Sequence, residues 1–465
     1  MIDDSIFREY DIRGIFNQNL TQEVVFKIGY LIGQRINSTD DATVVIGHDA
    51  RVHSLKLYEW LKDGLCSSGI KVYFIGLVPT PVAYFATCNS IDSIHSVNSI
   101  MITGSHNPPE YNGFKITLNK KPFYGSAIRE LGKELINLSI PIISSSMPIT
   151  SIDALDAYKK YLINHFKSLK NFPYKIVLDY GNGVGAVGME DILDALRIQH
   201  DCLFPDPDGN FPAHHPDPSE EKNLIDIKNH MSKNNIKIGL AFDGDADRIA
   251  LLSTHHSYKG DELAILFAKQ IAKDGTKPLI IGEVKCSQIM YDEINKIGQS
   301  VMYKTGHSNL KVKLKELNAH LAAEMSGHLF FNDRYFGYDD AIYAGLRALE
   351  LFLDHTPEEI EKIIQTLPEA YSTPEEKIIT TEEEKFIIIE KLHQMLKNPP
   401  SDFPKMLDIV CIDGIRVIFE DGWGLVRASN TTPVLVTRFE AKSKNNANKY
   451  KKSLLALIET IKKSL

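Results

Sequence analysis

The stretch Ala42-Thr-Val-Val-Ile-Gly47 is a short β-branched run, and a second run follows at Lys71-Val-Tyr-Phe-Ile-Gly76. Between them, residues 54–67 carry apolar side chains at helical spacing, so that one face would hold Leu57, Trp60, Leu61 and Leu65. This pattern predicts two strands joined by an amphipathic helix. Because such units are typical of α/β sheets covered by helices, this stretch decides the fold class.

The same alternation starts again twice further along the chain. It recurs at Lys175-Ile-Val-Leu-Asp179, where a helix at 189–196 and a strand at 236–242 follow. It recurs once more at 278–282, with a helix at 287–297. We find no fixed period, but the restarts predict three similar α/β units in series.

The C-terminal part of the chain breaks this pattern after a Pro-containing boundary near Ser372-Thr-Pro374. A helix at 382–396 precedes closely spaced strand candidates that meet at the turn signals Asp413-Gly414 and Asp421-Gly422, and a Lys-rich helix at 445–463 closes the chain. This order predicts a small α+β module with antiparallel strands. A small module appended to larger ones is a candidate lid.

Composition narrows the class of protein. The 465 residues are 43% hydrophobic and 24% charged, which is ordinary for a globular protein that has several domains. A net charge of −8 argues against coating nucleic acid or an anionic membrane. Five scattered cysteines without ligand spacing argue against a disulfide framework or zinc site. The acidic N-terminus and the lack of a long apolar run predict a soluble, cytoplasmic protein.

The loop Thr103-Gly-Ser-His-Asn-Pro-Pro-Glu-Tyr-Asn-Gly113 displays one hydroxyl, that of Ser105, after an apolar run. Glycine lets the backbone approach a ligand closely, and the prolines keep the loop out of helix and strand. Ser105 is therefore a candidate nucleophile or phosphate carrier, to which His106 and Lys115 would supply positive charge. An ordinary Ser/Asn/Pro turn is the alternative.

A carboxylate triplet follows the predicted strand at 236–242. Asp243, Asp245 and Asp247 alternate, so an extended loop would turn all three to one side, where a hard divalent cation would relieve their repulsion. A calcium EF-hand loop would need glycine at Arg248 and glutamate six residues later, and an aspartyl-phosphate phosphatase would need Gly-Thr after Asp-x-Asp. A solvated acidic turn fits poorly at a strand end. We predict a metal site.

The stretch Gly183-Val-Gly-Ala-Val-Gly188 matches the dinucleotide-binding fingerprint, and Asp206 stands at a suitable distance. Asp206, however, lies in a Pro-rich loop, whereas the fingerprint needs its acid at the end of a second strand. We interpret these glycines as a tight strand-to-helix turn, and a nicotinamide enzyme stays as the alternative.

Two later segments suit a phosphosugar. Glu324, Ser326 and His328 alternate, so an extended segment would present a carboxylate, a hydroxyl and an imidazole to sugar hydroxyls, with His328 as acid or base. The loop Gly424-Leu-Val-Arg-Ala-Ser-Asn-Thr-Thr-Pro433 combines a guanidinium with hydroxyls and an amide, which suits phosphate. A polar loop and a plain turn are the alternatives. Near the N-terminus, Tyr10-Asp-Ile-Arg-Gly14 adds another arginine, which a surface salt bridge would also explain.

In this order, the segments resemble the α-D-phosphohexomutase family. The matching stretches are Arg8–Gly14, Thr103–Gly113, Asp243–Arg248, Glu324–His328 and Arg427–Pro433, and they span nearly the whole chain. Met325 and the last loop are most similar to the bacterial phosphomannomutase/phosphoglucomutase branch. Phosphoglucosamine mutases usually have glutamine at position 325 and Ser-Gly-Thr-Glu-Pro in the last loop. Ala323 and Ala246 depart slightly from the family pattern, and neither removes a functional side chain.

The resemblance implies three α/β domains with mixed sheets and a smaller C-terminal α+β domain around a central cleft. We expect the domains at 1–150, 151–255, 256–370 and 371–465. In this order they would carry the phosphoserine loop, the metal loop, the sugar loop and a phosphate loop on a mobile lid.

The resemblance also assigns roles to residues. Ser105 would carry the phosphoryl group and, with Asp243, Asp245 and Asp247, hold Mg²⁺. The groups assisting proton and phosphoryl transfer would be Arg13, Lys115 and His328, with His106 beside the serine. Sugar hydroxyls would contact Glu324 and Ser326, and the non-reacting phosphate would contact Arg427, Ser429, Asn430 and Thr431. Further cleft positions would be Tyr10, Arg248, Lys285 and His307.

The implied activity interconverts hexose 1-phosphate and hexose 6-phosphate, with mannose or glucose as the sugar. Phosphoserine would form a hexose 1,6-bisphosphate, so glucose 1,6-bisphosphate or mannose 1,6-bisphosphate would act as activator. A phosphoglucosamine mutase, a metal-dependent sugar phosphatase and a non-catalytic sugar-phosphate-binding protein are the alternatives. We expect a monomer whose partners are small-molecule hexose phosphates, without nucleic acid or membrane.

Overall fold

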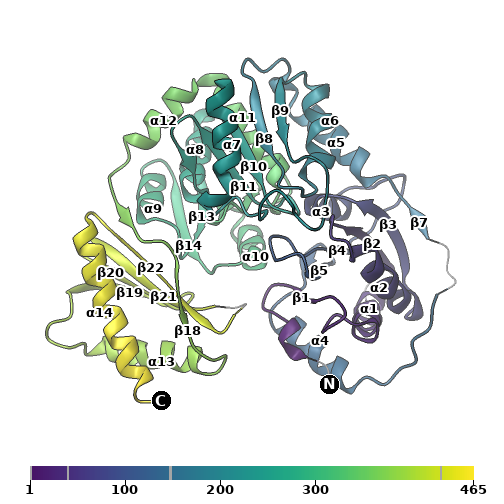
Figure 1. Ribbon diagram of the computed structural model, residues 1–465, viewed down its shortest axis with the longest axis horizontal. Coiled ribbons are helices and arrows are strands. Elements are labelled where there is room, and N and C mark those ends of the chain that lie inside the picture. The colour runs from purple at the N-terminus through teal and green to yellow at the C-terminus, as the bar shows by residue number, and fades with distance from the viewer. Residues whose placement is uncertain (1–2, 39–40, 146–148, 430–431) are drawn as a thin grey trace.

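The computed structural model describes residues 3–38, 41–145, 149–429 and 432–465 (Figure 1). Three α/β units follow one another along the chain, and a smaller C-terminal unit lies at one end, drawn in yellow in Figure 1. The predicted fold class is therefore confirmed. The exact boundaries expected between the domains stay predictions.

The first unit contains the stretch that opens the sequence argument. Its strands are β1 (Ile12–Ile15), β2 (Thr43–His48), β3 (Lys71–Leu77), β4 (Ser99–Ile102), β5 (Tyr111–Leu118), β6 (Lys121–Pro122) and β7 (Thr150–Ser151), and its helices are η1 (Asp4–Ile6), α1 (Gln22–Asn37), α2 (Ser54–Ser67), α3 (Thr80–Cys88) and α4 (Ser126–Asn137). The strand order is β1-β5-β4-β2-β3-β7, and β6 pairs with β5. β2 pairs in parallel with β3 and β4, whereas β5 is antiparallel to β4 and β1. Helix α2 has the bounds that its apolar spacing predicts.

The second unit repeats this arrangement. It contains α5 (Ala154–His165), η2 (Lys167–Leu169), β8 (Ile176–Asp179), α6 (Gly185–Ala195), β9 (His200–Leu203), η3 (Glu221–Leu224), α7 (Ile225–Asn234), β10 (Ile238–Phe242), β11 (Ile249–Ser253) and β12 (Ser257–Tyr258). The strand order is β12-β11-β10-β8-β9, parallel around β8 and antiparallel from β10 outward. The carboxylate triplet follows β10.

The third unit has the shortest sheet. It contains α8 (Gly260–Ile271), η4 (Ala272–Asp274), β13 (Leu279–Glu283), α9 (Gln288–Asn295), β14 (Gln299–Tyr303), α10 (His307–Leu317), β15 (Leu321–Ala323), β16 (Leu329–Phe331), α11 (Ala341–Asp354) and α12 (Pro357–Gln365). The strand order is β14-β13-β15-β16, and the final pair is antiparallel.

The C-terminal unit is an antiparallel α+β module, as predicted. It contains β17 (Tyr371–Ser372), β18 (Glu376–Ile379), α13 (Glu384–Lys397), β19 (Met406–Val410), β20 (Ile415–Phe419), β21 (Gly422–Ala428), β22 (Val434–Ala441) and α14 (Lys444–Lys462). The strand order is β17-β22-β21-β20-β19, and β18 also pairs with β22.

The hydrophobic cores show how the units are joined. One core runs from the edge of the first unit through the second and third, including Tyr84, Leu178 and Leu349. The C-terminal unit has a core of its own, and a small apolar cluster of Val284, Trp423 and Leu425 joins it to the third unit. The apolar part of the junction between the third and C-terminal units is therefore small.

One helix begins earlier than expected. Helix α6 starts at Gly185, four residues before the predicted start at 189, because the glycine-rich stretch itself forms the turn into the helix. A Cβ at Gly183 would lie 2.7 Å from the carbonyl oxygen of Gly244 in the carboxylate loop. The glycines thus permit close backbone approach, which confirms the tight-turn interpretation.

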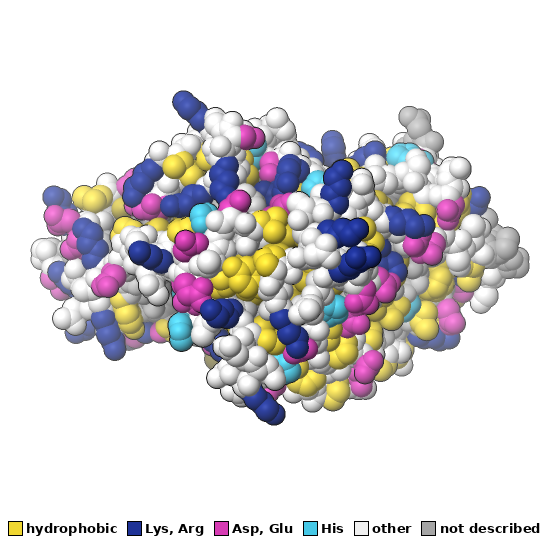
Figure 2. Space-filling model, turned by 90° about the horizontal axis from the view of Figure 1, so that it is seen from above, with side chains coloured by type: hydrophobic (Ala, Val, Ile, Leu, Met, Phe, Trp, Pro, Cys, Tyr) yellow, Lys and Arg dark blue, Asp and Glu magenta, His cyan; other side chains and the backbone are white. Residues whose placement is uncertain are grey.

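In Figure 2, basic and acidic side chains are interspersed over the face seen from above. This face carries no extended field of one sign, in keeping with the modest net charge of −8. Among the residues described, no helix combines the length and the apolar character needed to cross a membrane.

A buried carboxyl links the second and third units. Asp340 precedes α11 and accepts hydrogen bonds from Tyr343 N (2.8 Å), from Tyr335 Oη (2.8 Å) and from Tyr158 Oη on α5 (2.9 Å). Burial raises the pKa of Asp340 from 3.8 to about 7. The folded state therefore binds more protons than the unfolded chain between these pH values, and this group makes the protein less stable as the pH rises from about 4 to 7.

Asp340→Asn is expected to remove that part of the pH dependence, because asparagine still caps the helix but does not ionise. The pKa near 7 sets an upper bound on the effect of the order of 4 kcal/mol between pH 4 and 7. Urea unfolding at pH 4.5 and 7.5 measures it, with Asp354→Asn at the exposed end of the same helix as control. Identical pH dependence in D340N and the wild type would contradict the assignment.

Candidate active site

The hydroxyl of Ser105 is buried at the end of β4. Its Oγ donates to Asp243 Oδ2 (3.0 Å) and lies 3.1 Å from His106 Nδ1. The backbone N–H of Ser105 donates to Thr103 Oγ1 (2.8 Å), and the residue has a φ of +47°, in the left-handed region. The structure thus brings the predicted serine and the predicted carboxylate loop into direct contact.

The carboxylate loop is a tight turn and not the extended segment that the sequence pattern predicts. Asp243 N bonds to the carbonyl of Arg248, and Asp243 Oδ1 accepts from the backbone N–H groups of Asp247 (3.0 Å) and Arg248 (3.1 Å). Ala246 is left-handed, with φ +58°. The turn still gathers the carboxylates: one ligand atom each of Asp243, Asp245 and Asp247 lies within 4.8 Å of the others.

The electrostatics of this triplet are unbalanced. Burial and the carboxylates of Asp247 and Asp245 raise the pKa of Asp243 well above its usual range. The Lys115 ammonium lies 2.7 Å from Asp245 Oδ2 and also contacts Asp247. Burial by itself would raise the pKa of Asp245, but this ammonium holds the pKa well below its usual range. Lys115 thereby neutralises part of the charge, from its place on β5.

Two oxygens of the triplet are left over. Asp245 Oδ1 and Asp247 Oδ1 are buried and have no hydrogen-bond partner among the described residues. Unsatisfied buried carboxylate oxygens are costly unless a proton or a cation compensates them. A hard divalent cation such as Mg²⁺ takes oxygen ligands of this kind, so the residues present fit such an ion.

Arg13 on β1 holds the serine loop from the other side. Its Nη1 donates to the carbonyl of Gly104 (2.7 Å) and to Asn107 Oδ1, and its Nε donates to Asp11 (2.9 Å). The salt-bridge alternative is therefore partly right, because Arg13 pairs with Asp11. The pair is buried, however, and it faces the loop of Ser105.

The segment from Glu324 to His328 is a turn between the antiparallel strands β15 and β16, and the expected extended segment is wrong. Glu324 N bonds to the carbonyl of His328 (2.9 Å), and Gly327 has a φ of +94°. The short connection forces this turn, so the three side chains do not simply alternate. Glu324 and Ser326 still meet, because Ser326 Oγ donates to Glu324 Oε2 (3.2 Å).

His328 lies against the carboxylate loop. Arg248 Nε donates to His328 Nε2 (2.9 Å), which places the ring proton on Nδ1. Nδ1 faces Asp339 Oδ2 at 3.2 Å and Asp247 Oδ1 at 3.5 Å. Asp339 in turn pairs with Lys311 (2.8 Å). The sequence pattern does not single out Asp339, whose carboxylate lies within ion-pair distance of the imidazole.

A second unpredicted carboxyl supports the Glu324 loop. Glu283, at the end of β13, accepts from Met325 N (2.9 Å), and burial raises its pKa to about 7. The predicted cleft residue Lys285 lies 3.6 Å from Glu283 and 2.9 Å from Glu375, which follows the boundary to the C-terminal unit. Lys285 therefore stands where the third and C-terminal units meet.

Tyr10 and His307 also converge on this region. Tyr10 Oη donates to the carbonyl of Thr305 (2.8 Å), and its ring lies 6.0 Å from that of His307. The His307 ring lies 5.9 Å from that of His328, and burial lowers the pKa of His307 well below its usual range. Glu324 Oε1 accepts from Gly306 N (2.8 Å).

The Arg427 loop reaches the same segment from the C-terminal unit. Arg427 Nε donates to Asp413 Oδ2 (3.1 Å), and that oxygen also accepts from Thr305 N (3.1 Å). Arg427 Nη2 is buried and makes no hydrogen bond to any described residue, so it is available to an anion. Ser429 Oγ lies 3.0 Å from Thr432 Oγ1. The predicted phosphate ligands Asn430 and Thr431 lie outside the described residues.

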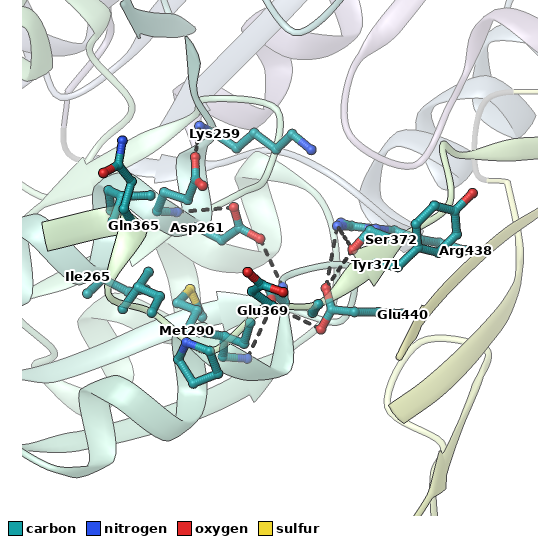
Figure 3. Close-up of a pocket in the computed structure, with 17 residues that line it drawn as sticks. Lys259, Asp261, Ile265, Met290, Gln365, Glu369, Tyr371, Ser372, Arg438 and Glu440 are labelled. Atoms are coloured by element: carbon teal, nitrogen blue, oxygen red, sulfur yellow. Dashed lines mark hydrogen bonds and ion pairs between the residues drawn. The ribbon is translucent and has the colours of Figure 1, made fainter. Parts of the chain in front are cut away.

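The junction between the third and C-terminal units carries many polar contacts (Figure 3). Glu440 on β22 accepts from Ser372 Oγ (2.8 Å), Ser287 Oγ (2.9 Å) and Gln288 N (3.0 Å), and Arg438 Nη1 donates to the carbonyl of Lys285 (2.6 Å). A cavity of about 690 Å³ opens beside these contacts. Polar contacts around a void join the C-terminal unit to the third unit, which suits a movable lid.

Models of known families match this chain from end to end. They describe phosphoglucomutase/phosphomannomutase α/β/α domain I at residues 4–135, domain II at 155–256, domain III at 259–371 and the C-terminal domain at 375–457. The chain is 39% identical to the phosphomannomutase/phosphoglucomutase of Pseudomonas aeruginosa over 463 residues, which cover 99% of this chain and 97% of that protein. It is 38% identical to the phosphoglucomutase of Neisseria gonorrhoeae, with 98% and 97% covered.

A solved structure has the same fold. The phosphoglucomutase/phosphomannomutase family protein of Burkholderia thailandensis superimposes with a TM-score of 0.90 at 36% identity. The alignment covers 99% of this chain and 98% of that one.

Proposed function

The chain belongs to the phosphoglucomutase/phosphomannomutase family of α-D-phosphohexomutases, and from this membership we propose how the Ser105 site works and which sugars it accepts. The protein is a hexose-phosphate mutase, an isomerase that interconverts hexose 1-phosphate and hexose 6-phosphate. The proposal for the site rests on one observation: the buried Ser105 hydroxyl contacts Asp243 in a carboxylate triplet that Lys115 only partly neutralises.

Ser105 carries the phosphoryl group. The P–O bond to Ser105 Oγ breaks as the sugar hydroxyl attacks, and a hexose 1,6-bisphosphate forms. The proton lost by the attacking sugar hydroxyl ends on Ser105 Oγ, which becomes a hydroxyl again. The cluster of Lys115, His328, Arg13 and His106 assists this proton and phosphoryl transfer. After the bisphosphate reorients, its other phosphate returns to Ser105. Glucose 1,6-bisphosphate or mannose 1,6-bisphosphate would therefore activate an unphosphorylated enzyme.

Charge stabilisation is most of what phosphoryl transfer requires. Asp243, Asp245, Asp247 and the Ser105 oxygen would hold Mg²⁺, which would offset charge on the transferring group. On the protein side, the carboxylates of Asp245 and Asp247 raise the pKa of Lys115 despite its burial, so Lys115 keeps its proton and serves as a fixed positive charge.

The C-terminal unit closes the site. Arg427 and Ser429, with Asn430 and Thr431, hold the phosphate that does not react, and Arg248, Lys285, His307 and Tyr10 contact the bound substrate. The separate core and small apolar junction of this unit support a lid that excludes water, which is the competing nucleophile. Action as a monomer and a cytoplasmic location stay predictions.

Glu324 and Ser326 read the sugar. If they contact the 3- and 4-hydroxyls, no contact distinguishes the orientation of the 2-hydroxyl. Because glucose and mannose differ only there, both of their phosphates are then substrates. We expect their kcat/KM values to agree within about tenfold, or ~1.4 kcal/mol. We also expect Glu324→Gln to lower both by the same factor, roughly 10–100-fold. A strong preference of the wild type for one epimer in kcat/KM would refute this assignment.

A coupled assay tests the function as a whole. Mannose 1-phosphate, glucose 1-phosphate and glucosamine 1-phosphate are followed with and without glucose 1,6-bisphosphate. The mutase converts the first two to 6-phosphates and responds to the bisphosphate. A phosphatase would instead release inorganic phosphate without the activator, a phosphoglucosamine mutase would favour the amino sugar, and a binding protein would leave every substrate unconverted.

A further inference from the structure

Arg51, in the connection between β2 and α2, lies beneath the serine loop. Its side chain has no exposed surface. Nη2 donates to the carbonyls of Ser105 (2.8 Å) and Asn107 (2.6 Å), and Nη1 donates to those of Pro108 (2.6 Å) and Tyr111 (2.9 Å). The planar fork of the guanidinium thus bonds three carbonyl oxygens of the loop between β4 and β5 and the carbonyl of Tyr111, the first residue of β5.

Asp49 completes this arrangement. Its Oδ2 lies 3.2 Å from Arg51 Nε and accepts from Gly104 N (3.1 Å), and its Oδ1 accepts from Ser54 Oγ (2.7 Å). Asp49 therefore binds the backbone N–H of Gly104, the residue before Ser105, and Arg51 binds the carbonyl of Ser105 itself. A Cβ at Gly104 would lie 2.4 Å from Arg51 Cζ, so the loop can rest on the guanidinium only with glycine there.

The contacts act on a strained residue. Ser105 has φ +47°, a conformation that is unfavourable for a non-glycine residue and persists only where its surroundings impose it. With the backbone in this conformation, Oγ reaches Asp243 Oδ2 at 3.0 Å. The hydrogen bonds that Arg51 donates to the carbonyls of Ser105 and Asn107 constrain this left-handed backbone.

Arg51 also meets the second unit, which carries the carboxylate triplet. The Phe211 ring centroid lies 5.1 Å from Arg51 Cζ, and a Cβ at Gly209 would lie 2.4 Å from Arg51 Cα. A Cβ at Gly244, inside the triplet, would lie 2.7 Å from the Ser105 carbonyl oxygen. That oxygen is thus enclosed between the guanidinium of one unit and the carboxylate turn of the other.

We propose that Arg51, together with Asp49, is a positioning residue that holds Ser105 in the left-handed conformation in which its Oγ faces the carboxylate triplet. Arg51 touches neither the triplet side chains nor the Ser105 hydroxyl in its hydrogen bonds, so it acts on phosphoryl transfer through the backbone. The inference rests on the proposed role of Ser105 as phosphate carrier. It predicts a loss in the rate of transfer and not in the binding of sugar phosphates.

The test compares full-length wild type with Arg51→Lys, which keeps the charge but has a single ammonium in place of the fork. Loading of Ser105 from glucose 1,6-bisphosphate is followed by intact mass, and discharge by glucose 1-phosphate is followed in a single turnover. We expect loading rate, discharge rate and kcat to fall about 100-fold, as for a misplaced reacting group, with KM within about threefold of wild type.

Arg347→Lys is the matched control. Arg347 on α11 is equally buried and bonds Asp333 (2.8 Å) and Gln270 (2.9 Å), away from the serine loop. We expect it to lower the thermal midpoint without changing loading rate or kcat. If R51K does not fold, Asp49→Asn tests the same clamp, because it removes the charge that pairs with Arg51; about a tenfold slower loading is then expected.

Loading and discharge at wild-type rates in R51K, or in D49N where R51K does not fold, would overturn the proposal. A raised KM with unchanged kcat would overturn it as well, because it would assign Arg51 to substrate binding. The proposed function fails separately: it is wrong if Ser105→Ala takes up phosphate from the bisphosphate like the wild type, whatever the behaviour of the Arg51 variants.

Discussion

Ser105→Ala is expected to lower the mutase kcat by at least ~10⁴-fold, because removal of a covalent nucleophile removes the pathway itself. The other side chains that contact the loop stay in place, so binding of glucose 1-phosphate should change little. The coupled assay measures the rate, and intact mass after incubation with glucose 1,6-bisphosphate should show no added phosphate on this variant.

Ser253→Ala is the control for this experiment. Ser253 is buried at the end of β11, and its Oγ lies 3.1 Å from Tyr258 Oη, outside the serine and carboxylate loops. We expect S253A to take up phosphate and turn over like the wild type. If Ser105→Ala still exchanges phosphate with the substrate at the normal rate, another residue carries the phosphate and the assignment of Ser105 is wrong.

Removal of divalent cations with a chelator is expected to lower the mutase rate by about 10³-fold or more, and added Mg²⁺ should restore it. The reason lies in the carboxylate triplet, where Asp245 Oδ1 and Asp247 Oδ1 are buried and accept no hydrogen bond from a described residue. Asp247→Asn should weaken Mg²⁺ binding, measured by calorimetry, at least ~100-fold. Even mutation of a residue that only hydrogen-bonds to a metal ligand typically lowers metal affinity by about 10–100-fold.

Metal binding also has a readout that does not depend on activity. Mg²⁺ at 100 times its dissociation constant should stabilise the folded wild type by about 2.7 kcal/mol, seen as a rise in the thermal midpoint. D247N should lose this rise. Asp179→Asn should keep it, because Asp179 is equally buried but bonds His214 (3.1 Å) and not the triplet. A mutase rate that does not respond to the chelator, or equal Mg²⁺ affinity in D247N and the wild type, would show that the carboxylate triplet is not the metal site.

Local patterns predicted the elements well where neighbouring residues determine the structure. Helix α2 runs from Ser54 to Ser67, as its apolar spacing predicts, and β2 and β3 flank it. The same approach failed to predict the backbone conformation of two loops. Asp243–Arg248 and Glu324–His328 alternate in sequence but fold as turns, because hydrogen bonds across each loop bend the backbone.

Several groups that complete the site leave no trace in the sequence pattern. Arg51, Asp49, Glu283 and Asp339 are single charged residues that no sequence motif marks, and Asp413 is marked only as part of a turn. Each gains its role from a partner in another segment: Asp339 from His328, for example, and Asp413 from Arg427. Such pairings depend on how the sheets and loops pack, so they cannot be predicted from local patterns in a single sequence.

By itself, the sequence determined the α/β units and the antiparallel C-terminal module, and it marked the residues that we predict to hold phosphate, metal and sugar. Periodicity and turn chemistry are properties of adjacent residues, so they can be read without a fold. Only the tertiary structure decided that Ser105 meets Asp243, 138 positions away, and that Arg51 donates a hydrogen bond to the Ser105 carbonyl. The reason is physical: burial removes water from these charged groups, so each must find its partner wherever the packed units place one.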